Sequence, residues 1–233
     1  MTNTTVSKKY ELINESHVKG ITLYRIRALR DFGDVKKGDI GGFIESEYNL
    51  SHQGNCWVYD DACVVSSGRV YENAKVCGNA VIGGFVYGNA HICGKIRVYF
   101  GAHIYDNAHL SDKVWIYQYA RVYGNAKLSG CARIYSTAEI YDHAVVSSSS
   151  KIYGKVYGNA SVGGYVKVYG SVYGNAKVTG YHTIRGLVHG NARLKRDGYS
   201  YVEQNIYYAY GIPEDCEIYE NDHVVKISEN KAA

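Results

Sequence analysis

The stretch KIYGKVYGNASVGGYV, residues 151–166, is followed by KVYGSVYGNAKVTGYH at 167–182 and by TIRGLVHGNARLKRDG at 183–198. The three segments have one length and align position by position, so they are consecutive copies of one repeat. Earlier copies are two residues longer, as in RVYFGAHIYDNAHLSDKV at 97–114. Repeats of this length are typical of a solenoid, in which each copy stacks on the next.

Each copy consists of six-residue units in which a small residue stands two positions before an aliphatic residue. The aliphatic residues recur six apart in two long series that start at Val58 and at Val86, and the pattern ends at Leu194. A period of six fits neither an α-helix nor a long strand, so it indicates a short strand and a corner. Because residues two apart point to the same side of a strand, we expect both columns to form the core.

Three units make one coil of 18 residues, and the shorter coils have 16. The short coils lose their two residues in the first unit, as in VIGGFV at 81–86, where a glycine turns the corner. We therefore expect long and short forms of one corner, with strands in constant register and coils about 4.8 Å apart. The expected coils are 45–62, 63–80, 81–96, 97–114, 115–132, 133–150, 151–166, 167–182 and 183–198.

This pattern resembles the hexapeptide-repeat proteins, which fold as single-stranded left-handed parallel β-helices with triangular coils. The resemblance implies the left-handed winding, which opposes the usual right-handed crossover. We therefore expect an all-β chain that forms one structural domain. Its parts are an N-terminal capping hairpin and lead-in at 1–44, the left-handed β-helix at 45–198, and a C-terminal cap and tail at 199–233.

The two ends of a solenoid expose open edges, so both are expected to carry caps. Residues 9–29 predict a hairpin of two strands around the turn NESHVKG. Residues 199–233 lose the repeat and contain Pro213, the one proline of the chain. Within them, CEIYENDHVVKI at 216–227 is expected to add a partial coil, and the last six residues are expected to fray.

A closer resemblance lies in DFGDVKKGDIGGFIESEYNLSHQGNCWVYDDA at 31–62. Its D-F-x-D-V-K start, the pair Gly41 and Gly42, and the L-S-x-Q-G-x-C-W run at 50–57 are similar to the lead-in of the YdcK-like bacterial proteins. That family, common also in phages and prophages, carries a loose transferase description. The resemblance implies a cap and a β-helix and supplies no catalytic residue. It places a phage accessory or anti-defence protein among the expected roles.

The composition bears on the compartment and on the partners. The net charge of +4 is too small to indicate nucleic acid, which is not an expected partner. The N-terminus lacks the apolar core of a signal peptide, and no apolar run approaches the length that spans a bilayer. We expect a cytoplasmic protein of the bacterial host without a membrane partner. Its six cysteines lack close pairs such as C-x-x-C, so reduced thiols are expected.

Tyrosines fill two outward columns, because the residue after each aliphatic position points away from the core. Stacking within each column would stabilise the sheet. Alternatively, the columns form a flat aromatic face for a protein, a second copy of the chain, a glycan or a nucleobase. The column of the second unit contains Tyr87, Tyr105, Tyr123, Tyr141, Tyr157 and Tyr173. The column of the first unit contains Tyr99, Tyr117, Tyr135 and Tyr153.

A third outward column begins with Lys75, His91, His109 and Lys127. It is a solvated basic edge or a row that binds phosphates. His91 and His109 should lie one strand spacing apart, but no third ligand accompanies them, and a catalytic zinc takes three. We therefore expect no metal site and no cofactor.

The sequence favours a non-enzymatic binding or scaffold protein that presents its tyrosine faces to a macromolecule or to itself. The second hypothesis is a trimeric acyltransferase-like enzyme that binds acyl-CoA between subunits and uses His103 or His109. A third is an oligomer that sequesters nucleotides between subunits. The β-helix is expected to run without a protruding loop, and a site that excludes water would need a second subunit. No catalytic residue is therefore assigned.

Overall fold

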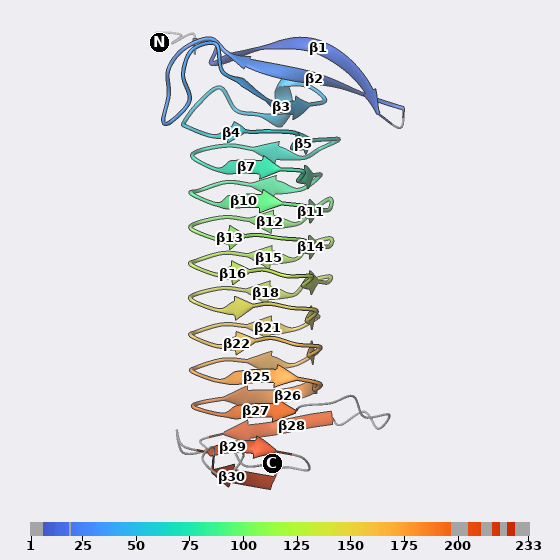
Figure 1. The fold of residues 1–233 in the computed structure, drawn as a ribbon, viewed down its shortest axis with the longest axis vertical. Helices are drawn as coiled ribbons and strands as arrows, with labels where there is room; N and C mark the ends of the chain where they lie inside the picture. The colour runs from blue at the N-terminus through green and yellow to red at the C-terminus, as the bar shows by residue number, and fades with distance from the viewer. Residues whose placement is uncertain (1–6, 19, 197–204, 211–215, 220–222, 227–233) are drawn as a thin grey trace, which may run out of the picture.

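The computed structural model describes residues 7–18, 20–196, 205–210, 216–219 and 223–226. In these ranges the chain is an all-β parallel solenoid of about nine turns with an antiparallel hairpin at its N-terminal end. The hairpin of β1 and β2 lies across one end of the stack, and β29 and β30 lie at the other (Figure 1). No helix within the described ranges has the length and apolar character needed to cross a bilayer.

The N-terminal hairpin is formed by β1 (Tyr10–Val18) and β2 (Ile21–Ala28), as the sequence predicts. The predicted turn is wrong, because most of NESHVKG belongs to the strands and a bulge follows Ile13. Strand β3 (Ile40–Ile44) pairs antiparallel with β2 and parallel with β5 (Cys63–Val64). The hairpin is thus hydrogen-bonded through β3 to the coil of residues 63–80.

The coil that contains the short 3-10 helix η1 (Glu47–Asn49) contributes one strand, β4, and each coil from residue 63 to residue 182 contributes one strand to each of three columns of parallel strands. The outer surfaces of these columns are called the first, second and third faces. The first face contains β5, β8 (Val81–Ile82), β11 (Arg97–Val98), β14 (Trp115–Ile116), β17 (Arg133–Ile134), β20 (Lys151–Ile152) and β23 (Lys167–Val168).

The second and third faces repeat the arrangement. The long strand β26 (Thr183–His189) spans the first and second faces at the lower end. The second face contains β6 (Arg69–Val70), β9 (Phe85–Val86), β12 (His103–Ile104), β15 (Arg121–Val122), β18 (Glu139–Ile140), β21 (Lys155–Val156) and β24 (Ser171–Val172). The third face contains β4 (Trp57–Val58), β7 (Lys75–Gly78), β10 (His91–Gly94), β13 (His109–Leu110), β16 (Lys127–Leu128), β19 (Val145–Val146), β22 (Ser161–Val162), β25 (Lys177–Gly180) and β27 (Arg193–Arg196).

The strand register confirms the repeat and its two lengths. Arg97 pairs with Trp115 across an 18-residue coil, and Lys151 pairs with Lys167 across a 16-residue coil. Every aliphatic residue of the predicted series is at most 2% exposed, and the alanines two positions before them are fully buried. The interior of the stack is therefore core, which leaves the outer faces and the two ends for function.

His182 occupies the small-residue position of this core, two residues before Ile184. It is 7% exposed, and within the described ranges neither of its ring nitrogens has a hydrogen-bond partner. Burial, assisted by the charge of Arg196, lowers the pKa of His182 to about 4. The folded protein thus holds a neutral imidazole at a pH where the unfolded chain binds a proton.

We expect this histidine to make the stability of the fold depend on pH. Since the unfolded imidazole titrates near pH 6.5, the free energy of unfolding should fall by about 3 kcal/mol between pH 6.5 and pH 4 through this group. The variant His182→Val removes this contribution. Urea unfolding of both proteins at pH 7, 5.5 and 4 measures it. A stability difference between them that does not change with pH would show that His182 titrates normally in the fold.

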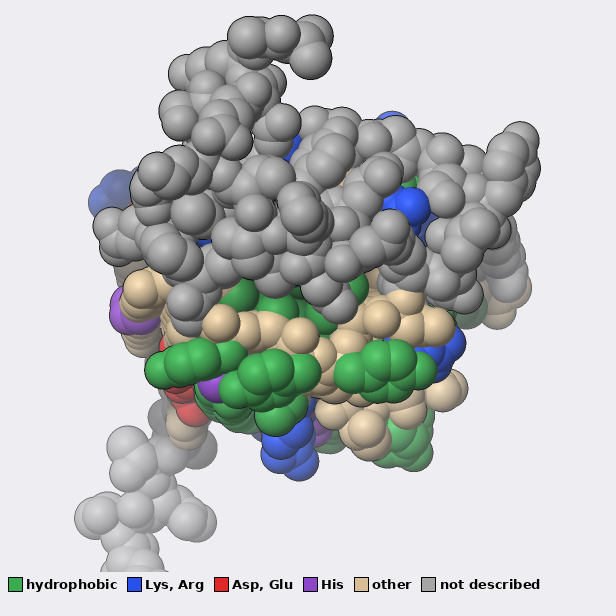
Figure 2. Space-filling view, turned by 90° about the horizontal axis from the view of Figure 1, so that it is seen from below, with side chains coloured by type: hydrophobic (Ala, Val, Ile, Leu, Met, Phe, Trp, Pro, Cys, Tyr) green, Lys and Arg blue, Asp and Glu red, His purple; other side chains and the backbone are tan. Residues whose placement is uncertain are grey.

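The C-terminal cap continues the stack in part. Strand β28 (Asn205–Tyr210) pairs parallel with β26, and β29 (Cys216–Tyr219) pairs parallel with β27 and antiparallel with β30 (His223–Lys226). The predicted partial coil is confirmed for β29, whereas β30 turns back antiparallel to it as a hairpin. Pro213 and the last six residues lie outside the described residues. Tyr207, Tyr208 and Tyr210 of β28 are more than 60% exposed. Figure 2, seen from this end, shows a row of hydrophobic side chains across the view, beside the grey atoms.

The expectation of reduced thiols is wrong for one pair. Cys77 and Cys93 are joined by a disulfide. They are 16 residues apart, one short coil, and they occupy facing positions in β7 and β10. A pairing of this kind is invisible to a search for C-x-x-C, because stacking and not local spacing brings the sulfurs together. Cys56, Cys63 and Cys131 are free thiols.

Candidate functional site

The second face carries an unbroken ladder of stacked aromatic rings. Neighbouring ring centroids lie 4.7 to 4.9 Å apart, and their planes differ by no more than 7°. The rings come from the outward position after each inward aliphatic residue, as predicted. This second-face ladder consists of Tyr71, Tyr87, Tyr105, Tyr123, Tyr141, Tyr157, Tyr173 and His189.

A second ladder lies on the first face. Its centroids are 4.5 to 5.0 Å apart, with planes within 7° of parallel. The guanidinium of Arg185 lies 4.9 Å from the ring centroid of Tyr169 and closes the lower end of the ladder. This first-face ladder consists of Tyr99, Tyr117, Tyr135, Tyr153 and Tyr169. A separate stacked pair, Tyr165 and Tyr181, stands at a neighbouring corner and was not predicted.

Within each ladder, the face of every ring packs against the face of the next ring. Because parallel rings this close cover one another, a partner meets mainly ring edges and phenol hydroxyls rather than open π-faces. This geometry supports self-stacking and disfavours a glycan or nucleobase that stacks on the rings. Burial, and then the phenols of Tyr71 and Tyr105, raises the pKa of Tyr87 to about 12. The hydroxyls are therefore neutral at physiological pH and are able to donate hydrogen bonds.

The third face brings the predicted basic column together. Lys75, His91, His109 and Lys127 are consecutive partners in the strand register. The Nδ1 atoms of His91 and His109 are 3.3 Å apart, and Lys75 forms an ion pair of 2.8 Å with Asp34 of the cap. Burial, and then the adjacent His109, lowers the pKa of His91. Nowhere in the described ranges do three His, Cys, Asp or Glu side chains form a group able to hold a metal ion.

A column of asparagines beside the second-face ladder has a structural role. It consists of Asn73, Asn89, Asn107, Asn125, Asn159, Asn175 and Asn191. Its side-chain amides form hydrogen bonds from coil to coil, for example from Nδ2 of Asn89 to Oδ1 of Asn107 at 3.2 Å. The same bond joins Asn159 to Asn175. These exposed amides satisfy one another along the stack, so the column stabilises the corners and leaves little hydrogen-bonding capacity for a ligand.

His103, a candidate base of the enzyme hypothesis, lies on the second face in β12. Its ring stacks on Phe85 at 4.8 Å and meets the edge of Tyr87 at 6.1 Å. Burial, and then the charge of Arg121, lowers the pKa of His103. The imidazole is thus neutral and packed on aromatic neighbours.

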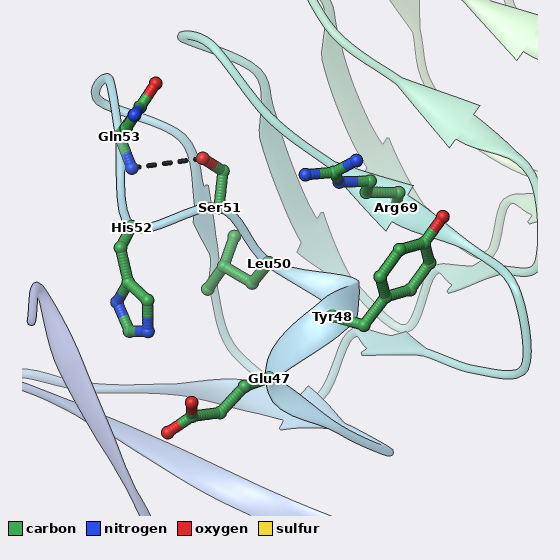
Figure 3. A pocket seen from close by; sticks show the side chains of 7 residues that line it. All are labelled: Glu47, Tyr48, Leu50, Ser51, His52, Gln53 and Arg69. Carbon is green, nitrogen blue, oxygen red and sulfur yellow. Dashed lines mark hydrogen bonds between the residues drawn. The ribbon is translucent and has the colours of Figure 1, made fainter. Parts of the chain in front are cut away.

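A shallow pocket of about 290 Å³ opens where the cap meets the first coils. Figure 3 shows the side chains that line it, with Arg69 and Tyr48 on one side and His52 and Glu47 on another. Ser51 Oγ accepts a hydrogen bond from the backbone N–H of Gln53. His52 Nδ1 is likewise engaged with a backbone N–H group, that of Lys9, so the described contacts of these two side chains are structural.

The pocket residues instead hold the cap in place. His52 Nδ1 accepts a hydrogen bond from the backbone N–H of Lys9, and its ring stacks on Tyr10 at 4.3 Å. Glu47 pairs with Lys8 at 2.7 Å. Burial lowers the pKa of His52, so it lies in the cap as a neutral packing group.

One group of outward residues escaped the sequence analysis. On the first face, the position before each inward aliphatic residue carries Arg97, Trp115, Arg133, Lys151 and Lys167, which are successive partners in the strand register. The same six-residue pattern that identified the third-face column would have revealed them. This basic row was missed because basic character was judged from the low net charge of the whole chain.

Comparison with known proteins adds a partial relative. No family model matches the chain. A segment is 34% identical over 87 residues to the Uncharacterized acetyltransferase YdcK of Escherichia coli (strain K12). The match covers 33% of this chain and 27% of that protein, so the chain spans about a quarter of the length of its relative. The chain is thus a β-solenoid protein distantly related to that protein.

Proposed function

We propose that this chain is a non-enzymatic binding or scaffold protein whose tyrosine ladders engage a macromolecule or a second copy. The observation that carries the proposal is the continuity of the ladders, which run over successive coils without an interrupting loop. We also propose that the coils are triangular and wind left-handed, as in the hexapeptide-repeat proteins, and that the protein acts in the cytoplasm of a bacterial host.

The ladders make a rigid surface. Each ring is fixed by its neighbours, so binding costs little side-chain entropy, and phenol edges and hydroxyls provide both apolar contact and hydrogen bonds. On the second face these rings lie beside side chains of both charges, since Arg121 precedes Glu139 in the column and Glu139 is paired with Lys155 at 2.7 Å. This combination of apolar ring edges, hydroxyls and paired charges suits a protein partner or another copy of the chain.

The test removes three consecutive rings from the second-face ladder. We expect Tyr105→Ser, Tyr123→Ser and Tyr141→Ser in one chain to abolish association through this face while the fold remains. Light scattering of the purified proteins gives the mass, and pull-down from a bacterial lysate gives the partners. The matched control carries Tyr117→Ser, Tyr135→Ser and Tyr153→Ser on the first face. Each triple variant should lose about 1 kcal/mol of stability per ring, which thermal melting measures.

The outcomes separate the proposals. If the second-face variant keeps the mass and the bound proteins of the unaltered chain, the ladder is only structural and the binding proposal is wrong. If the unaltered chain is a monomer near 25.9 kDa, any partner is a different macromolecule. A trimer of the unaltered chain that survives the tyrosine substitutions favours the second candidate function.

That second candidate is an acyltransferase-like activity at a site between subunits, and the similarity to the acetyltransferase YdcK favours it. Acetyl-CoA turnover by the unaltered chain, lost in His103→Ala or His109→Ala, would support it. If the unaltered chain is a trimer, equilibrium binding of mononucleotides tests whether it sequesters nucleotides between its subunits.

A further inference from the structure

The first face combines two parallel rows of hydrogen-bond donors. One row is the first-face ladder. The other consists of Arg97, Arg133 and Lys151, together with Trp115, at the neighbouring outward position of the same strands. Successive members of each row are one strand spacing apart, about 4.8 Å. Lys95 and Lys113 are exposed at the corner that precedes the face and widen the basic surface.

Charge is distributed very unevenly along the chain. Residues 81–196 contain 14 Lys and Arg against 4 Asp and Glu, whereas residues 197–233 contain 2 against 8. The net charge of +4 therefore conceals a formal charge of +10 on residues 81–196, which form most of the solenoid. A charge of this size on a narrow stack of coils creates a strong positive potential.

The four carboxylates of residues 81–196 have partners away from the first face. Asp106 and Asp142 accept hydrogen bonds from the backbone N–H groups of Gly124 and Gly158 at the corner between the second and third faces. Asp112 in the same way accepts a bond from Gly130, 2.8 Å away.

The fourth carboxylate, Glu139, pairs with Lys155 on the second face. No outward position of β11, β14, β17, β20 or β23 is acidic. Arg97, Arg133 and Lys151 are therefore not the partners that this geometry gives to the four carboxylates, which lie at the corners and on the second face.

The aromatic residues hold this basic row in place. The guanidinium of Arg133 lies 4.8 Å from the ring centroid of Trp115, and a hydrogen bond to the Tyr135 phenol helps to raise the pKa of Arg133. Packing of this face on the same face of another copy would bring like charges together, which opposes association. The ligand whose charge complements this regular row of cations is a regular linear polyanion.

We propose that the first face binds the phosphate backbone of nucleic acid. Arg97, Arg133 and Lys151 neutralise phosphates, and the hydroxyls of the first-face ladder donate hydrogen bonds to phosphate oxygens. The face is built of flat, covered rings, so it reads no bases, and binding is independent of sequence and steeply dependent on salt. This inference departs from the expectation drawn from net charge, and it rests on the proposed role of the ladder faces as binding surfaces.

The test measures the fluorescence anisotropy of labelled single-stranded DNA, single-stranded RNA and duplex DNA, each of 30 nucleotides or base pairs, from 50 to 200 mM NaCl. We expect the triple variant Arg97→Gln, Arg133→Gln, Lys151→Gln to bind at least about tenfold more weakly. The slope of log K against log salt should become less steep, by about 2 to 3. The matched control, Arg121→Gln, Lys127→Gln, Lys177→Gln, removes equal charge from the other faces. The affinity of this control for each nucleic acid should stay within about threefold of that of the unaltered chain.

Three results would overturn the inference: no binding of any of these nucleic acids at 50 mM NaCl, an equal loss in both charge variants, or displacement of DNA by polyglutamate at equal charge concentration. The last result would assign the face to acidic proteins. The second-face variant, with Tyr105, Tyr123 and Tyr141 replaced by Ser, should bind nucleic acid normally. Failure of nucleic-acid binding therefore leaves the proposal for the second face standing.

Discussion

Trp57→Ala is expected to lose about 3 to 5 kcal/mol of the free energy of unfolding, more than any other single side-chain truncation considered for this protein. Trp57 is 1% exposed. Its ring meets Phe32 at 5.4 Å and Tyr10 at 6.2 Å, both edge to face. Gly41 lies against the ring so closely that a Cβ there would be 2.6 Å from Trp57 Cζ2. The side chain thus joins the cap to the first coil.

The control for this prediction is the other tryptophan of the chain. Trp115 lies on the first face, partly exposed, against Arg133 and Tyr117. Trp115→Ala should therefore lose only about 1 kcal/mol. Urea unfolding followed by circular dichroism measures both, and each variant keeps one tryptophan as a fluorescent reporter. Equal losses in the two variants would mean that the cap is not packed on the coil as described.

Gly170→Ala is expected to lose about 3 kcal/mol, because the added methyl group has no space. Gly170 turns the short corner of a 16-residue coil, and its Cβ would overlap the carbonyl oxygen of Gly186 in the next coil. Gly154 stands in the same relation to Gly170. Backbone oxygens at stacked corners cannot move independently, so the overlap must be relieved by separating the coils. Thermal melting of the variant tests the loss.

Gly83→Ala is the matched control, because it adds the same methyl group at another short corner. There a Cβ would be 3.4 Å from the carbonyl oxygen of Val98, an ordinary contact. The variant should be as stable as the unaltered protein or more stable by up to about 1 kcal/mol, since alanine restricts the unfolded chain. A large loss at Gly83, or none at Gly170, would contradict the description of the short corner.

Sequence alone determined the architecture of the solenoid because every coil repeats one local rule. A small residue and an aliphatic residue two positions apart must face the same side, and three such units return the chain to its starting point. Their burial, the coil lengths of 16 and 18 and the outward columns therefore followed from spacing. The tyrosines of both ladders and the column from Lys75 to Lys127 were predicted and are brought together.

Only the tertiary structure decided what the outward residues do. The ring faces of the tyrosines are covered by the next coil, Cys77 meets Cys93, and the carboxylate of Asp112 accepts a bond from the Gly130 backbone. The cap likewise depends on contacts such as Lys9 Nζ with the Cys56 carbonyl, 2.8 Å apart and 47 residues distant in sequence. Periodicity specifies which way a side chain points, because that is local. Partners and charge neutralisation depend on contacts across the stack.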